Sequence, residues 1–75
     1  MTNYEVSIWR ERTDDQPDIV TTIEAGAADD AMVKAMRANG MRVAMKVEVR
    51  TADGLLCWQW RCVLLLAQHY MFLRA

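Results

Sequence analysis

Cysteine, proline and glycine are all scarce in this sequence, which has two cysteines, one proline and three glycines in 75 residues. Cys57 and Cys62 are too few for the disulfide framework that stabilises many small secreted domains. Gly26, Gly40 and Gly54 stand far apart, so they form no glycine-rich phosphate-binding loop. Because the N-terminus also lacks the basic and then apolar segments of a signal peptide, we expect a cytoplasmic protein.

An excess of charge of one sign and a long apolar run are missing as well. The formal net charge is -1 at pH 7 and the pI is about 5.7, whereas nucleic-acid-binding domains are usually strongly basic. The most apolar stretch, residues 62–73, contains Gln68 and His69 and is shorter than the roughly 20 residues that a transmembrane helix needs. We therefore expect no membrane span and no strong direct nucleic-acid binding. With 53% hydrophobic residues, the composition indicates one globular domain over residues 1–75.

Side chains for catalysis or metal binding are also few. His69 is the only histidine, so a nucleophile has no evident general base beside it. Cys57 and Cys62 lie five residues apart on an expected strand, which directs their thiols to opposite faces, roughly 17 Å apart along the chain. That spacing argues against a metal site shared with His69. We expect a non-enzymatic protein with no catalytic residues, no metal and no cofactor.

Alternation of polar and apolar residues predicts a first β-hairpin. Residues 4–12 alternate with a period of two, and residues 19–23 are rich in β-branched side chains. The segment between them is dense in turn-forming residues. In the expected register Ile8 faces Ile23, and Trp9 lies on the opposite, polar face of the strand.

A change of period predicts a single helix over Asp29–Asn39. Small and apolar residues recur here at spacings of three and four, at Ala28, Ala31, Met32, Ala35 and Met36. Aspartates come early and basic residues late, which complements the helix dipole. We expect the alanine and methionine face of this helix to cover one face of a sheet.

Residues 42–50 alternate again and lead into Asp53-Gly54, a strong signal for a two-residue hairpin turn. This alternation places Val43, Met45, Val47 and Val49 on the core side. Counting outward from the turn pairs Val49 with Trp58 and Val47 with Trp60. The resulting prediction is an α+β fold in the order ββαββ: a small antiparallel sheet with one helix packed on one face.

The C-terminal tail, residues 63–75, has no punctuating glycine, proline, asparagine or aspartate. Its composition favours a helix, and a further strand is the alternative. A short helix could not bury all of its apolar surface, so one expectation is a homodimer joined through the tail or insertion of the tail into a partner. The other is that the tail completes the core of the monomer.

The outward face of the second hairpin is the main candidate binding site. Its members are Arg42, Lys46, Glu48, Arg50, Gln59 and Arg61. Lys46 directly opposite Arg61 is unfavourable, although Glu48 is expected diagonally within reach of Arg61, and an acidic partner would relieve the repulsion. We add Trp9, because a tryptophan on a polar strand face is often an interface anchor. An ordinary solvated face is the competing interpretation.

Part of the sequence resembles the central region of a known protein family. The matching parts are residues 23–25, the alanine-rich helix and the run Met45-Lys46-Val47-Glu48 leading to Asp53-Gly54-Leu55. The family is that of small phage-encoded anti-CRISPR proteins that inhibit the type I-F surveillance complex. The resemblance covers about 35 residues.

The resemblance implies a viral inhibitor that acts in the host cytoplasm, binds the backbone subunits of the complex and blocks target DNA. Lys46 and Glu48 fall at matching motif positions, with Arg50 and Arg61 as neighbours. The alternatives are a small dimerising interaction module of a phage or bacterium, and an accessory protein that contacts nucleic acid through its basic strand face.

Overall fold

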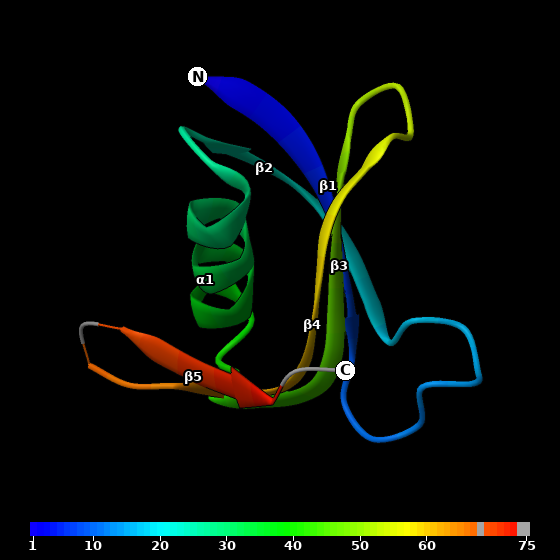
Figure 1. Cartoon of the computed structure of the whole chain (residues 1–75), viewed down its shortest axis with the longest axis vertical. Coiled ribbons are helices and arrows are strands. Elements are labelled where there is room, and N and C mark those ends of the chain that lie inside the picture. Colours follow the sequence, from blue (N-terminus) through cyan, green and yellow to red (C-terminus); the bar gives the residue numbers. More distant parts are fainter. Residues whose placement is uncertain (68, 74–75) are drawn as a thin grey trace.

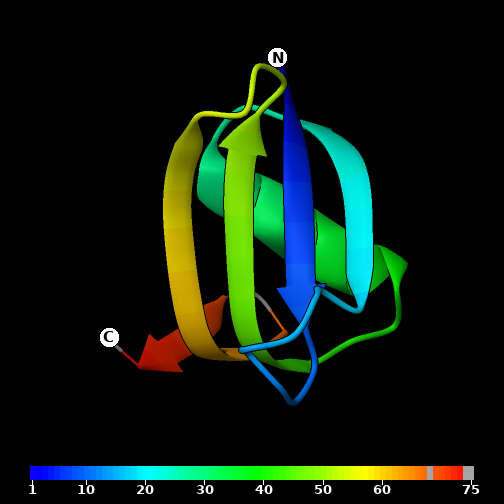
Figure 2. The same cartoon turned by 90° about the vertical axis from the view of Figure 1, so that its right-hand side faces the viewer.

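Two strands, one helix and three further strands make up the fold. The computed structural model describes residues 1–67 and 69–73, with elements β1 (Thr2–Trp9), β2 (Ile19–Ala25), α1 (Ala28–Ala38), β3 (Val43–Thr51), β4 (Leu56–Leu65) and β5 (Tyr70–Leu73). The strands form one antiparallel sheet in the order β2-β1-β3-β4-β5 (Figure 2). Helix α1 lies against one face of this sheet (Figure 1). The fold is therefore α+β, and its order is ββαβββ.

Helix α1 packs its small side chains and methionines against the sheet. Ala31, Met32, Ala35 and Met36 are fully buried, and they lie against a strand face that includes Val6, Ile8, Val47 and Val49. Their spacing of three and four places all of them on one side of the helix. The helix is followed by Gly40, whose φ of 65° favours glycine. The helix predicted from the sequence is confirmed to within one residue at each end.

The first hairpin is shorter than the sequence predicted. β1 ends at Trp9, and Ile8 pairs with Ile19 instead of Ile23. Asp18 closes the longer loop, because its backbone N–H donates to the Ile8 carbonyl at 2.9 Å and its carboxylate accepts from the Arg10 N–H at 2.7 Å. The register differs by four residues, an even number, so the side chains of the paired residues stay on the expected face of the sheet.

The second hairpin has the predicted strand register but a different turn. The Thr51 N–H donates to the Leu55 carbonyl at 2.9 Å, so the loop is Ala52-Asp53-Gly54, with φ of 91° at Gly54. This is the three-residue loop with a left-handed third residue, not the predicted two-residue turn. Cys57 is then the extra residue of a bulge between the Arg50–Leu56 and Val49–Trp58 pairs.

The extra loop residue and the bulge offset one another along the hairpin. Val49 therefore faces Trp58 and Val47 faces Trp60, as the sequence predicted. Lys46 opposite Arg61 and Glu48 opposite Gln59 are confirmed in the same way.

A bend near Cys62 reverses the alternation of side chains in β3 and β4. Cys62 has a positive φ of 50°, and beyond it the pair Ala44 and Val63 points into the core. Val43 and Met45 are exposed as a result, which corrects the prediction that both belong to the core face. The ends of β3 and β4 curve beneath α1 (Figure 1).

The C-terminal tail forms strand, not helix. β4 continues to Leu65, and β5 returns beside it after a turn in which the Leu66 N–H donates to the His69 carbonyl at 2.7 Å. The helix favoured from composition is wrong because pairing with β4 and packing of Tyr70 on the core outweigh a weak local preference. The part of the tail prediction that concerns Gln68, Arg74 and Ala75 lies outside the described residues.

Candidate functional site

A short row of charges lies on the outer face of the sheet, the face that α1 does not cover. On β3 the Glu48 carboxylate is 3.3 Å from Lys46 Nζ and 3.1 Å from Arg50 Nη2. The side chains of Lys46 and Glu48 are only 14% and 15% exposed, and that of Arg50 is 36% exposed. These three predicted site residues are therefore together, and the single carboxylate offsets only part of the charge of its two cationic neighbours.

Arg61 and Gln59 extend the row of charges onto β4. Gln59 is opposite Glu48, and Arg61 is opposite Lys46. Glu48 forms its ion pairs along its own strand, so the expected diagonal contact with Arg61 does not form. Arg61 is exposed and belongs to no ion pair among residues 1–67 and 69–73. Its guanidinium is available to a carboxylate of a partner.

Trp9 lies on the predicted face but is not an exposed anchor. It is 6% exposed, its indole N–H donates to the Asp15 carbonyl at 2.7 Å, and Lys46 Nζ lies 4.3 Å from the ring centroid. The loop between β1 and β2 projects on this side of the sheet (Figure 1). Trp9 fixes this loop and positions Lys46 by a cation–π contact, which corrects the expectation of an accessible tryptophan.

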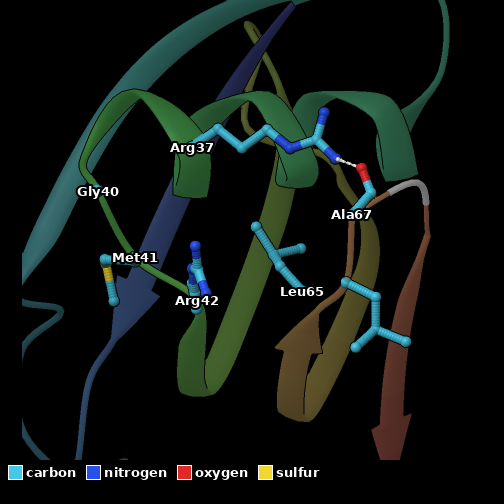
Figure 3. Close-up of a pocket in the computed structure, with 7 residues that line it drawn as sticks. Arg37, Gly40, Met41, Arg42, Leu65 and Ala67 are labelled. Carbon is cyan, nitrogen blue, oxygen red and sulfur yellow. Dashed lines mark hydrogen bonds between the residues drawn. The ribbon is translucent and has the colours of Figure 1, made fainter.

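Arg42 does not join the other predicted site residues. It precedes the bend and lines a cavity of about 610 Å³ together with Arg37, Met41 and Leu65 (Figure 3). Arg37 in this cavity donates to the Ala67 carbonyl at 3.1 Å and lies in the last turn of α1, where it offsets the negative end of the helix dipole. Both features give Arg37 a structural role.

An apolar row crosses the outer face where the sheet bends. Val43, Leu64 and Met71 are successive cross-strand neighbours on β3, β4 and β5, and Leu73 is opposite Arg61. Their exposed fractions are 57%, 40%, 58% and 65%, respectively. Sequence reasoning found the excess of apolar surface in the tail but missed Val43, because strict alternation places this residue in the core. The positive φ at Cys62 has no distinct sequence signal.

Four aromatic rings line a second apolar surface, on the helix side of the sheet. The ring centroids of Trp58 and Trp60 are 6.3 Å apart, those of Trp60 and Tyr70 are 6.4 Å apart, and those of Tyr70 and Phe72 are 5.8 Å apart. They border a cavity of about 290 Å³ together with Ala28, Asp29 and Cys57. Trp58 is on the predicted face and yet 55% exposed.

Within residues 1–67 and 69–73 no three His, Cys, Asp or Glu side chains are grouped to hold a metal ion. Both cysteines are free thiols. The hydrogen bond from Thr51 lowers the pKa of the exposed Asp53, which lies in the β3–β4 loop. In the same part of the chain no helix is long and apolar enough to cross a membrane.

Comparisons with known proteins add no family to the description of this chain as a small ββαβββ domain. No protein-family model matches the sequence, and neither curated proteins nor solved structures give a match. The surfaces described above are therefore the features that bear on function.

Proposed function

We propose that this chain is a non-enzymatic binding protein that acts by covering a surface of a protein partner. The contact is made by the outer patch, which we define as Val43, Gln59, Arg61, Leu64, Met71 and Leu73. The observation that carries the proposal is the exposed apolar row with Arg61 beside it. An apolar centre with a charged and polar rim is the usual anatomy of a protein–protein interface.

The size of the outer patch supports this role. Four apolar side chains exposed by 40% to 65% present on the order of 400 Å², comparable to the largest apolar patches on ordinary monomers. A specific interface buries about 800 Å² on each partner, so the contact must extend from the apolar row onto Arg61 and Gln59.

The most concrete form of the proposal is inhibition of a CRISPR surveillance complex. Its support is the resemblance of about 35 residues to anti-CRISPR proteins. Lys46 and Glu48, at the matching motif positions, are held in ion pairs and mostly covered. Arg61 and Arg50, with their more accessible guanidinium groups, would then contact the partner, and Lys46 and Glu48 would position Arg50.

The test measures binding of target DNA by a purified type I-F surveillance complex with and without this protein. We expect the protein to bind the complex and to reduce its retention of target DNA. Leu64→Ser and Arg61→Glu should each weaken binding at least tenfold. The matched controls are Val20→Ser and Arg12→Glu, at exposed positions away from the patch, and they should bind like the wild type. Unchanged DNA retention at excess protein would refute the CRISPR form of the proposal.

Capture of host proteins tests the outer patch independently of that complex. A partner retained equally by the wild type, Leu64→Ser and Arg61→Glu would show that the outer patch is not the contact. Loss of the partner in both variants, with normal folding, would support the patch whatever the partner is.

A homodimer is the second candidate, and the same apolar row favours it. Val43, Leu64 and Met71 carry no charge, so two copies of the row can meet across a twofold axis without repulsion. Sedimentation at micromolar concentration should then show a dimer that Met71→Ser abolishes and Val20→Ser preserves. A monomer at every concentration would refute the homodimer, and the apolar row would then contact a different partner.

A further inference from the structure

Aromatic side chains make up most of the lining of the aromatic cavity on the helix side of the sheet. Trp58, Trp60, Tyr70 and Phe72 contribute four rings, with Trp60 buried and Trp58 and Phe72 exposed. Trp60 and Tyr70 meet edge to face, at an interplanar angle of 87°. The Trp60 ring is therefore steeply inclined to both of its neighbours, Trp58 at 54° and Tyr70 at 87°.

One carboxylate lies at the rim of this cavity. Among residues 1–67 and 69–73, Asp29 in the first turn of α1 is the only acidic or basic residue in the cavity lining. It forms no ion pair within the described part of the chain, whereas the adjacent Asp30 pairs with Lys34 at 3.3 Å. The Asp29 carboxylate accepts the Asp30 backbone N–H at 2.9 Å and can still accept further hydrogen bonds.

This combination selects a cation over other ligands. The faces of aromatic rings carry negative potential and attract ammonium and guanidinium groups, and a nearby carboxylate adds to the attraction. An anion would be repelled by Asp29 and by the ring faces. The two aspartates also offset the positive end of the helix dipole, which would otherwise oppose a cation. The same chain already places Lys46 over Trp9 on its outer face.

The neighbouring strand indicates how the cation is presented. β5 is the last strand of the sheet, so one of its edges is unpaired among residues 1–67 and 69–73. Tyr70 and Phe72, which line the cavity, belong to this strand. An extended peptide that adds to the unpaired edge would carry its side chains past the aromatic rings.

We infer that the aromatic cavity formed by Trp58, Trp60, Tyr70 and Phe72 binds a lysine or arginine side chain of an extended peptide, with Asp29 as its counter-ion. This site is on the face of the sheet opposite the outer patch. It goes beyond the proposed function, and neither depends on the other.

The test is a titration of the full chain, followed by NMR, with two capped pentapeptides that have either lysine or norleucine at the centre. Norleucine has the four-carbon side chain without the ammonium group. We expect the lysine peptide to bind roughly tenfold more tightly. The indole N–H signals of Trp58 and Trp60 should shift on binding, and that of Trp9, on the other face, should not.

Substitutions in the cavity distinguish recognition of the cation from nonspecific apolar binding. Asp29→Asn should weaken the lysine peptide several-fold and leave the norleucine peptide unchanged, and Trp58→Leu should weaken the lysine peptide as well. Asp30→Asn removes the same charge from the same helical turn outside the cavity and should have no effect on binding.

Three results would overturn the inference. These are equal affinity for the two peptides, an equal loss in Asp29→Asn and Asp30→Asn, and binding of N-acetyl-lysine methylamide as tight as that of the lysine peptide. The last would show that the extended peptide contributes nothing. Arg61→Glu, which tests the outer patch, should leave this titration unchanged, so either proposal can fail alone.

Discussion

Replacing Glu48 with glutamine tests whether the charges on the outer face stabilise the fold. Glutamine keeps the shape of the side chain, but it removes the charge and replaces one of the two acceptor oxygens with an NH2 donor. Two contacts are then weakened, to Lys46 at 3.3 Å and to Arg50 at 3.1 Å. Exposed ion pairs contribute about 0.2–1 kcal/mol, and breaking a buried pair costs about 3–5 kcal/mol. For a carboxylate that is 15% exposed we expect a loss of about 2 kcal/mol in the free energy of unfolding.

The loss should appear in urea denaturation and as a fall in the melting temperature of roughly 10 °C for a domain of this size. The control is Asp30→Asn, which breaks an exposed pair with Lys34 and should cost about 0.3–0.5 kcal/mol. If both variants lose the same small amount, the Glu48 ion pairs contribute no more than ordinary surface contacts. The charged row would then have no role in stability, and our reading of it would be wrong.

Three further predictions concern the core and the β3–β4 loop. Met36→Ala removes a fully buried side chain under the sheet, and urea denaturation should show a loss of about 2–4 kcal/mol. Gly54→Ala places a side chain at φ of 91° and should cost about 1 kcal/mol by the same assay, although no atom blocks the added carbon. Thr51→Val should raise the pKa of Asp53 towards its ordinary value in an NMR titration, because the hydrogen bond that lowers this pKa is removed. Since the folded-state pKa is lowered, the stabilisation from this contact is present above the ordinary carboxyl pKa and is lost as the pH falls through the folded-state value.

Local pattern was enough to predict the helix and the pairing of β3 with β4. The spacing of Ala31, Met32, Ala35 and Met36 defines a buried helix face in any context that supplies a sheet. Val49 and Val47 face Trp58 and Trp60 because a one-residue slip would bury charge, whatever the turn between them. The side chains of β1 likewise lie on the expected faces, because its pairing with β2 differed by four residues and an even shift does not exchange the faces.

Of the predicted site, the sequence placed Lys46, Glu48, Arg50, Gln59 and Arg61 on one face, since alternation within a strand is a local property. Arg42 was separated from them by the bend. Trp9 was covered by the loop that follows it.

The bend, the fifth strand and the exposure of the apolar row were decided by tertiary structure. The positive φ at Cys62 reverses which side chains of β4 point inward. As a result Val63 is buried in the core and Leu64 is exposed. β5 forms because β4 offers it an edge and the core accepts Tyr70, contacts between segments that local composition does not encode. A strand pattern fixes the order of faces along a straight strand, but where a strand curves depends on what it must cover.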